Sequence, residues 1–358
     1  MVRTTFAGLI FLSFITNAQD TLSVKNVTIL PLPVVFSTPE TGLGFGALVS
    51  GIFNLGRPEN TRSSNIQSLV AYTVNGQIIA QINNNIFTKD EKYNLFGEIS
   101  YFDFPILYYG IGNDSNDESE TELGSQVIIF QQRLLKQVKR NHFVGGQYRF
   151  INVFDVEFNP NSILIDSDTL KIRSDAGIYS GMGFSYVYDS RDNVLNAQQG
   201  KFLELSGTFH SDALGSKRDF VRYRMDYRRY WMINEKSAFA AQFLGEFNNG
   251  SVPFRELALM GGDQIMRGYY RGRYRDKNQV ALQGECRRQV NEWLGFVLFA
   301  AAGEVGSALD DIALSNFKWA AGGGLRLMVN KKERTNLRID YGIGDGTTGL
   351  YFAFAEAF

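Results

Sequence analysis

Strict alternation between apolar and charged side chains is the feature that most restricts how this chain can fold. The clearest stretch is "FVRYRMDYRRYW", from Phe220 to Trp231. Successive side chains of an extended strand point to opposite faces. Such a strand suits a membrane barrel, where an aromatic face meets lipid and a charged face lines a wet lumen. The first face carries Val221, Tyr223, Met225, Tyr227 and Trp231, and the second carries Arg222, Arg224, Asp226 and Arg228.

A strand of a soluble β-sandwich also alternates, but its polar face rarely carries this many charges opposite large aromatics. Glycine (36 residues) and aromatic residues (14%) are abundant while proline (7 residues) is scarce, which suits long strands. We therefore predict an all-β chain that forms an antiparallel transmembrane β-barrel. The alternation recurs in "NLRIDYG", with Leu337, Ile339 and Tyr341 opposite Arg338 and Asp340, and in "AGGGLRLMV", with Leu325 and Leu327 opposite Arg326.

Segments of this kind predict about 16 strands of roughly 9 to 15 residues, as in bacterial outer-membrane barrels. Such barrels have short periplasmic turns and longer external loops on alternate ends. Here the external connectors include "GNDSNDESETELG", "NPNSILIDSDTLKIRS" and the long segment with Arg267, whereas "TKDE", "VKRN", "INEK" and "VNEW" are tight. The predicted strands begin near residues 28, 41, 63, 77, 92, 124, 141, 176, 199, 218, 236, 278, 293, 317, 335 and 349.

The amino terminus has the pattern of a secretory signal. Arg3 precedes an apolar run over residues 6–15, and Ala18 ends a set of small residues suited to cleavage. The run is too short to span a membrane as a helix. We expect a signal peptide over residues 1–18, a short periplasmic segment over 19–27 and the barrel over 28–358, placed in the outer membrane of a bacterial cell. The lipid bilayer is then a partner, and nucleic acid is not.

The chain ends with the aromatic strand "GLYFAFAEAF". Period two predicts one apolar face along it, and pairing of this strand with the first would close the barrel without a free edge. Glu356 interrupts the apolar face, and we expect it at the interface, where charge costs little. The predicted apolar face consists of Leu350, Phe352, Phe354 and Phe358.

Several kinds of chemistry find little support in the sequence. The single Cys286 excludes an internal disulfide and a cysteine-based metal cluster, and the presence of only two histidines, His142 and His210, argues against a multi-histidine metal site. His210 lies beside Ser211, but adjacency does not make a catalytic triad and no nucleophile elbow is present. The glycine-rich stretches do not open a helix within a βαβ unit. We predict a protein that is not an enzyme and has no metal or cofactor.

Four stretches resemble the outer-membrane assembly factor superfamily of BamA, TamA and the bacterial surface antigens. "STPETGLGFGA" is similar to the family's first hairpin, and "LYYGIGN" is similar to its glycine-aromatic segment. "YVYDSRDNVLNAQQGKFLEL" is similar to a periplasmic-turn motif, and "GGDQIMRGYYRGRYRDKN" to the family's Arg-Gly-aromatic loop. The turn motif falls on Asp189, Arg191, Asp192, Asn193 and Gly200, and the loop motif falls on Gly261, Gly262, Arg267, Gly268 and Tyr269.

The resemblance implies that the long loop lies inside the barrel and does not bind nucleic acid. A guanidinium can hold a carboxylate through two parallel hydrogen bonds, so lumen carboxylates would attract Arg267. Ala301 stands where the family usually has an aspartate, which leaves Glu285 as the preferred partner. Arg271, Arg273 and Arg275 suit a solvated external face as well as a specific role. The predicted lumen partners are Glu285, Arg287, Asp226, Arg326, Arg338 and Asp340.

Two functions are compatible with these features. The resemblance implies assembly or translocation of outer-membrane proteins through a lateral seam between the first and last strands, with unfolded clients and periplasmic or lipoprotein partners. The first strand begins so soon after the signal that we expect a member without the family's periplasmic (POTRA) domains. The alternative is a passive pore or structural barrel whose lumen is plugged by the Arg267 loop.

Overall fold

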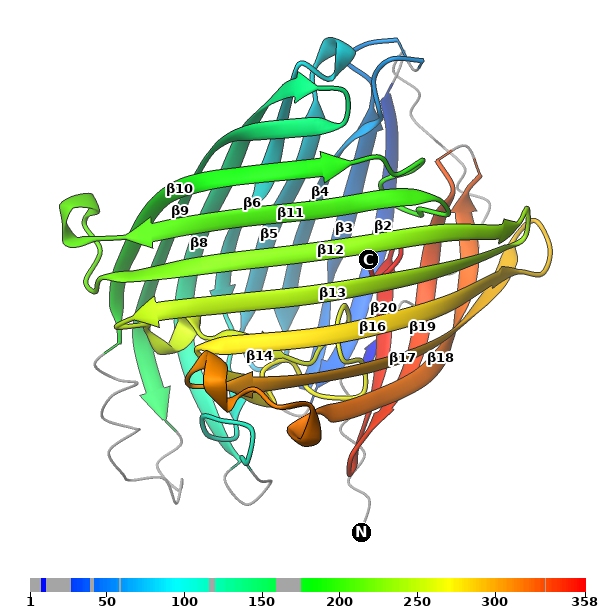
Figure 1. Ribbon diagram of the computed structural model, residues 1–358. Helices are drawn as coiled ribbons and strands as arrows, with labels where there is room; N and C mark the ends of the chain where they lie inside the picture. The colour runs from blue at the N-terminus through cyan, green and yellow to red at the C-terminus, as the bar shows by residue number, and fades with distance from the viewer. Residues whose placement is uncertain are drawn as a thin grey trace.

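The alternating segments form one antiparallel sheet that curves into a barrel (Figure 1). The computed structural model describes residues 8–10, 27–38, 42–57, 59–115, 120–158, 175–331 and 333–358. Within these ranges the sheet has 18 strands, of which β1 and β7 are only three residues long. The remaining sixteen pair in chain order from β2 to β20, which confirms the predicted fold class. Residues 39–41 of the stretch that resembles a first hairpin, residues 116–119 of the acidic connector and the whole connector at 159–174 lie outside the described residues.

The first half of the sheet contains ten strands. The largest error in a predicted strand start is at β8, which begins at Thr121 and was predicted to begin near residue 124. β7 pairs with the beginning of β8, so it extends the sheet edge beyond β6. These strands are β1 (Gly8–Ile10), β2 (Val27–Thr38), β3 (Gly42–Phe53), β4 (Ser64–Thr73), β5 (Ile78–Phe87), β6 (Tyr93–Asp103), β7 (Ile106–Tyr108), β8 (Thr121–Lys139), β9 (His142–Phe158) and β10 (Gly177–Asp189).

The second half has eight further strands in the barrel wall and a separate two-stranded ladder, β14 with β15, in a connector. No helix among the described segments is long and apolar enough to cross a membrane. The strands are β11 (Gly200–His210), β12 (Phe220–Asn234), β13 (Ser237–Gly250), β14 (Ala258–Met260), β15 (Tyr274–Asp276), β16 (Asn278–Gln289), β17 (Leu294–Gly306), β18 (Lys318–Asn330), β19 (Thr335–Gly344) and β20 (Thr347–Phe354). The short 3-10 helices are η1 (Lys89–Glu91), η3 (Asp212–Leu214), η4 (Phe254–Glu256), η5 (Leu309–Asp311) and η6 (Leu314–Asn316).

The two faces of the wall have opposite character. On β12, Tyr223 and Trp231 are exposed on the outer face while Asp226 is buried on the inner face. Aromatic and aliphatic side chains continue around the outside, and charged side chains are enclosed inside, which is the reverse of a soluble protein and suits a surrounding of lipid. Other exposed apolar side chains of the wall include Phe45, Val70, Ile99, Leu134, Phe184, Leu205, Leu298, Trp319, Leu325 and Tyr341.

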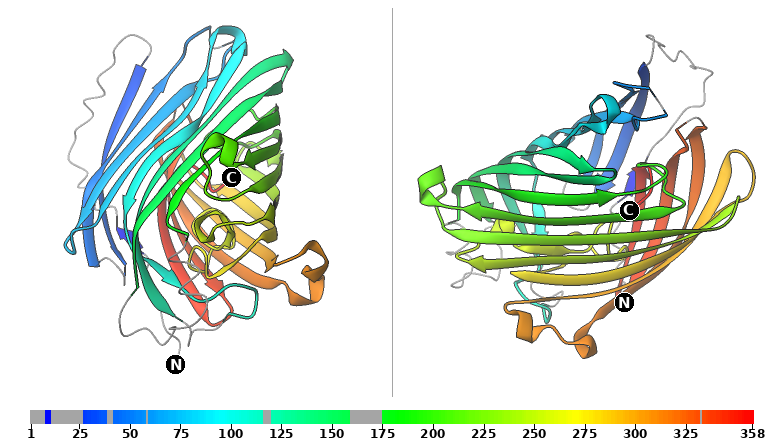
Figure 2. Two further views of the ribbon diagram at one scale, coloured as in Figure 1. Left: turned by 90° about the vertical axis from the view of Figure 1, so that its left-hand side faces the viewer. Right: turned by 45° about the horizontal axis from the view of Figure 1, so that its top comes forward.

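The connectors also differ between the two ends. At one end the turns are short, for example at residues 140–141 between β8 and β9 and at 235–236 between β12 and β13. The connectors at 54–63, between β3 and β4, and at 190–199, between β10 and β11, are the longer exceptions at this end. At the other end lies the connector at 251–277, between β13 and β16, which lies within the ring of strands (Figure 2).

The sheet has a seam between the first and last long strands, β2 (blue) and β20 (red in Figure 1). β20 pairs with β19, and β2 pairs with β3. The short strand β1 pairs with β2 at Val35–Ser37 and also contacts β20, so it lies between them. The direct pairing of first and last strands that we expected is therefore replaced there by pairing with β1.

The carboxyl terminus corrects two expectations. β20 ends at Phe354, and Ala355 has a φ of 68°, so the chain turns away from the strand direction. Phe358 is buried against Tyr230 and is not on the lipid face. Glu356 is buried as well and accepts a hydrogen bond from Arg326 at 2.7 Å, so it does not lie at the interface. A buried carboxylate is stable only with such partners, and these lie on the lumen side.

Candidate functional site

The connector at residues 251–277 carries the candidate site into the lumen. Gly261, Gly262 and Gly268 have φ values of 108°, 110° and 126°, in the left-handed half of backbone space that favours glycine. Between them the chain reverses, and the amide of Gly262 donates to the carbonyl of Tyr269 at 3.0 Å. The loop motif is therefore a compact turn whose tip is Arg267.

Arg267 is fully buried and lies between two carboxylates. Its Nη1 donates to Asp340 Oδ2 at 2.7 Å, and its Nη2 donates to Glu285 Oε1. The guanidinium also lies over the ring of Phe299, with its carbon 3.6 Å from the ring centroid. Glu285 was the preferred partner from the sequence, and Asp340 is the additional one. Ala301 stands where the family usually has an aspartate. Arg267 nevertheless has two counter-charges, because Glu285 and Asp340 both contact it.

The two carboxylates belong to a larger charged cluster on the lumen wall. Glu285 also accepts from Arg287 at 2.8 Å, and Asp340 also accepts from Arg338 at 2.9 Å. Each buried charge is thus compensated several times, which a low-dielectric interior requires. The cluster, called the lumen cluster below, consists of Arg267, Arg287, Arg326 and Arg338 with Glu285, Asp340, Glu356 and Asp263.

The loop also packs backbone to backbone against β19. A Cβ added to Gly268 would lie 2.6 Å from the carbonyl carbon of Ile343, and one added to Gly342 would lie 2.4 Å from the carbonyl oxygen of Arg267. Gly344 leaves room for the Tyr269 ring in the same way. Glycines on both surfaces therefore permit a contact that larger residues would prevent.

Tyr269 and Tyr351 fasten the loop to the last strands. The Tyr269 hydroxyl donates to the carbonyl of Trp319 on β18 at 2.9 Å. The Tyr351 hydroxyl on β20 accepts from the Gly268 amide at 2.9 Å and donates to the Tyr269 carbonyl at 3.0 Å. Tyr351 was not among our predicted site residues, although period two places it on the lumen face. The loop is thus attached to the strand that forms one side of the seam.

Gly268→Ala is expected to displace the loop, because the added methyl meets the backbone of β19 and the φ of 126° is unfavourable for alanine. Gly215→Ala is the matched control, since Gly215 has a φ of 82° but open space around it and lies in the connector between β11 and β12. Accessibility of the loop to a protease added from outside would be measured. An equal response of both variants would mean that backbone strain, and not the packing against β19, is responsible.

The predicted lumen partner Asp226 belongs to a different group. It accepts from Arg228 at 2.6 Å and from Gln242 at 2.9 Å, and Arg224 also contacts it. This group lies on β12 and β13, and it reaches the loop only indirectly, because Gln283 donates both to Gln242 at 2.6 Å and to the carbonyl of Gln264 at 2.8 Å. Asp226 therefore compensates charges on the wall and does not contact Arg267, contrary to the attraction we expected.

The predicted turn motif forms a folded connector at the short-turn end. Asp189 accepts from Arg191 at 2.9 Å, and Gly200, with a φ of 109°, passes close to the Ser190 carbonyl. Asn193 donates to the carbonyl of Glu333 at 3.0 Å. Asp192 pairs with Arg334 in that same β18–β19 turn at 2.7 Å. The motif thus ties the turn after β10 to a turn that is distant in sequence.

The turn motif also reaches the lumen cluster through neighbouring residues. Arg287 donates to the carbonyl of Ala197 at 3.1 Å and to the carbonyl of Phe358 at 3.0 Å. The Glu356 amide donates to the carbonyl of Leu195 at 3.1 Å. The structure therefore brings together the turn, the carboxyl terminus and the loop cluster, three features that the sequence presented separately.

The remaining loop arginines lie near the long-connector end. Arg275 is buried and donates to the carbonyls of Gly272 and Leu107, with its guanidinium 4.6 Å from the Phe254 ring centroid. Arg273 is also buried, over the rings of Tyr109 and Tyr274. Arg273 and Arg275 therefore do not form the solvated external face that was one of the two expected roles.

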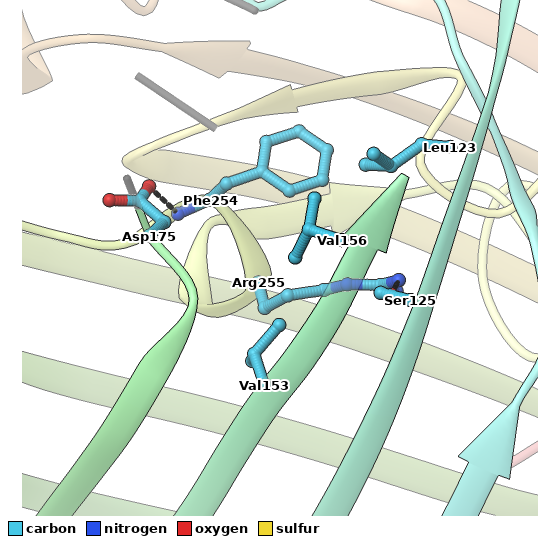
Figure 3. A pocket seen from close by; sticks show the side chains of 7 residues that line it. All are labelled: Leu123, Ser125, Val153, Val156, Asp175, Phe254 and Arg255. Atoms are coloured by element: carbon cyan, nitrogen blue, oxygen red, sulfur yellow. Dashed lines mark hydrogen bonds between the residues drawn. The ribbon is translucent and has the colours of Figure 1, made fainter. Parts of the chain in front are cut away.

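The short helix η4 closes this end against β8 and β9. Arg149 holds the Glu256 carboxylate at 2.6 Å; burial would raise the pKa of that carboxyl, but Arg149 and Arg222 lower it to about 2. Beside η4 is a small pocket, in which Phe254 donates its amide to Asp175 at 2.8 Å and Arg255 points toward Ser125 (Figure 3). The pocket is also lined by Leu123, Val153 and Val156.

Fold and site together define a class: a transmembrane β-barrel whose lumen holds its own connector, fixed to the wall by an arginine between two carboxylates. The chain belongs to the Omp85 superfamily, because the Omp85 superfamily domain matches residues 79–358. No curated protein sequence matches the chain.

Solved structures share the fold at low sequence identity. BamA from Haemophilus ducreyi, in a structure lacking POTRA domains 1–3, is 14% identical with a TM-score of 0.56, over 93% of this chain and 70% of that chain. CdiB from Escherichia coli is 11% identical with a TM-score of 0.61, over 92% of this chain. CdiB from Acinetobacter baumannii is 13% identical with a TM-score of 0.55, over 90% of this chain. This chain spans 60% and 56% of the two CdiB chains.

Proposed function

We propose that this protein is an outer-membrane barrel of a bacterial cell that takes part in protein assembly or translocation through the seam between β2 and β20. Membership of the Omp85 superfamily supports a role with client proteins. The unfolded outer-membrane proteins that would pair at the seam are its clients. Periplasmic or lipoprotein partners would deliver them.

The attachment of the lumen loop to β20 carries this proposal. Tyr351 bonds both Gly268 and Tyr269, and Thr347 donates to the Gly268 carbonyl at 3.1 Å. Both residues lie on the strand that faces the seam. A movement of the loop therefore changes the support of β20, and a movement of β20 changes the loop. A loop that only blocked the lumen would not need this attachment to β20, whereas a loop that controls the opening of the seam would.

The pairing of β1 supports a seam that accepts a strand. Gly8, Leu9 and Ile10 pair antiparallel with Ser37, Phe36 and Val35 of β2. Backbone pairing at a strand edge does not depend on side-chain identity, and unpaired backbone groups in lipid cost several kcal/mol each. Cleavage after Ala18, as the sequence predicts, would remove β1 and leave that edge to another strand.

The test is a folding assay in liposomes. A urea-unfolded small outer-membrane barrel is added to vesicles that contain the purified protein, and its folding rate is compared with that in empty vesicles. We expect a faster rate with the wild type and loss of the increase with Arg267→Ala. Arg228→Ala is the control, because it removes a lumen arginine that does not contact the loop. No acceleration by the wild type would contradict the proposal.

Tyr351→Phe is expected to weaken the attachment of the loop to β20 without unfolding the barrel. The ring still fills its place, but two hydrogen bonds to the loop are lost, each with a net contribution of about 1 kcal/mol. We expect a reduced rate increase in the folding assay, while the folded barrel stays intact and loses its folded band only about 5 °C lower than the wild type. A full rate increase in the variant would show that attachment to β20 is not required.

A loop-plugged pore or structural barrel is the second candidate. The apolar cluster formed by Met260, Ile265, Met266 and Tyr269 with the wall favours it, because it fills the lumen with packed side chains. Ion conductance in the same vesicles distinguishes the two. Conductance through the wild type without any acceleration of client folding would favour the pore.

A further inference from the structure

Two of the prolines of this chain lie close together in the first long strand, β2. Pro31 and Pro33 both lack the backbone N–H that a ladder needs, so within sheets proline is confined to edges and bulges. The ladder between β2 and β3 nevertheless runs without a register shift from Val27 to Thr38. The missing donors must therefore point away from β3.

The register confirms this direction. The Val74 amide donates to the Leu43 carbonyl at 2.9 Å, so Leu43 and every second residue of β3 after it direct their backbone groups toward β4. Leu48 belongs to the alternate set of β3 residues, whose backbone N–H and C=O groups point toward β2, and it pairs with Leu32. Leu32 and its alternate neighbours therefore face β3, whereas Pro31 and Pro33 face the seam.

The opposite side of the seam has its donors. The Ala355 amide donates to the Asn336 carbonyl at 2.8 Å, so Ala355 and its alternates face β19. Leu350 and Phe352 then direct their amides and carbonyls toward the seam. Carbonyls of β20 that come opposite Pro31 or Pro33 meet no donor. Each proline carbonyl can still accept from β20, so closure over this stretch gains one hydrogen bond at each proline where an ordinary pair would gain two.

We propose that Pro31 and Pro33 prevent β2 from pairing continuously with β20 and limit strand addition at the seam to the short stretches on either side of them, of which Val35–Ser37 is paired in the structure. The pairing of β1 begins at Val35, two residues after Pro33. The partner that fits this edge is an extended antiparallel segment that pairs through its backbone over a few residues. The second half of the proposal rests on the proposed function, because it takes the seam as the place where a client strand binds.

The test is the double variant Pro31→Val with Pro33→Val, which restores two donors at the seam with a residue that favours strands. We expect the temperature at which the folded band is lost on a gel to rise by about 5 °C. Replacing proline increases the conformational entropy of the unfolded chain, which by itself would lower that temperature. A rise would therefore report new backbone pairing. Leu32→Val is the matched control, because its amide faces β3 and no donor is added.

Nuclear magnetic resonance of the double variant in nanodiscs gives a direct readout. We expect the new amides at positions 31 and 33 to show cross-strand contacts with β20. An unchanged or lower gel temperature together with no such contacts would overturn the inference. If the contacts form and client folding slows, both proposals stand; if they form and client folding keeps its wild-type rate, the prolines control the seam but clients do not use it.

Discussion

Replacing Arg267 with alanine is expected to lower the stability of the folded barrel by about 4 kcal/mol. The change leaves Glu285 and Asp340 buried with one fewer counter-charge each, and it removes the guanidinium from the Phe299 ring. The temperature of unfolding on a gel would fall, and conductance would rise because the loop is no longer held in the lumen. Arg267→Lys should recover little of the loss, because an ammonium group cannot hold two carboxylates in the same fork geometry.

A double-mutant cycle tests whether the contacts of Arg267 act together. Glu285→Ala is expected to have an effect similar to that of Arg267→Ala, and the double variant should lose much less than the sum. Arg228→Ala combined with Arg267→Ala is the control, since those two arginines share no partner. Additive losses for Arg267 and Glu285 would mean that their contact contributes nothing to stability.

Cross-linking the seam is expected to have the largest effect on activity. With Cys286→Ser as the background, a panel of cysteine pairs would place one cysteine within residues 29–34 of β2 and the other within 350–354 of β20. A disulfide requires Cα atoms about 4.4 to 6.8 Å apart, so only matching positions would react. In the oxidised form, client folding should fall to the rate in empty vesicles, and a reductant should restore it.

The control for this experiment is a disulfide inside the wall. Val70→Cys with Ala80→Cys joins two directly opposed positions of β4 and β5, away from the seam. This cross-link should leave the rate of client folding at the wild-type value. If the cross-linked seam also retains full activity, the clients do not enter between β2 and β20.

The sequence predicted the face of the strand on which each site residue lies, but not the partner of each residue. Period two placed Glu285, Arg326 and Asp340 on the lumen face, because a strand alternates its side chains regardless of its neighbours. It could not say that Asp226 pairs with Arg228 while Asp340 holds Arg267, since both carboxylates have the same pattern in sequence. The choice between them depends on which strands the loop contacts, and the glycines of β19 allow that contact.

The carboxyl terminus shows the limit of the alternation rule. The rule assumes that the strand continues, and it therefore placed Phe358 on the lipid face and Glu356 at the interface. Ala355 takes a φ of 68°, after which the last residues turn to the lumen side and Glu356 meets Arg326. The attraction of two arginines for this carboxylate is a tertiary interaction, and no local pattern in the strand contains it.

The sequence by itself determined the barrel: the strands, their faces, their approximate starts and the long connector that carries Arg267. Local alternation and turn residues are sufficient for this, because a membrane requires every strand to be paired and every outer face to be apolar. Only the tertiary structure decided which charges meet, where the last residues lie, and which edge of β2 lacks its donors. These depend on register and on contacts between residues far apart in the chain, and a pattern with a period of two residues does not record either.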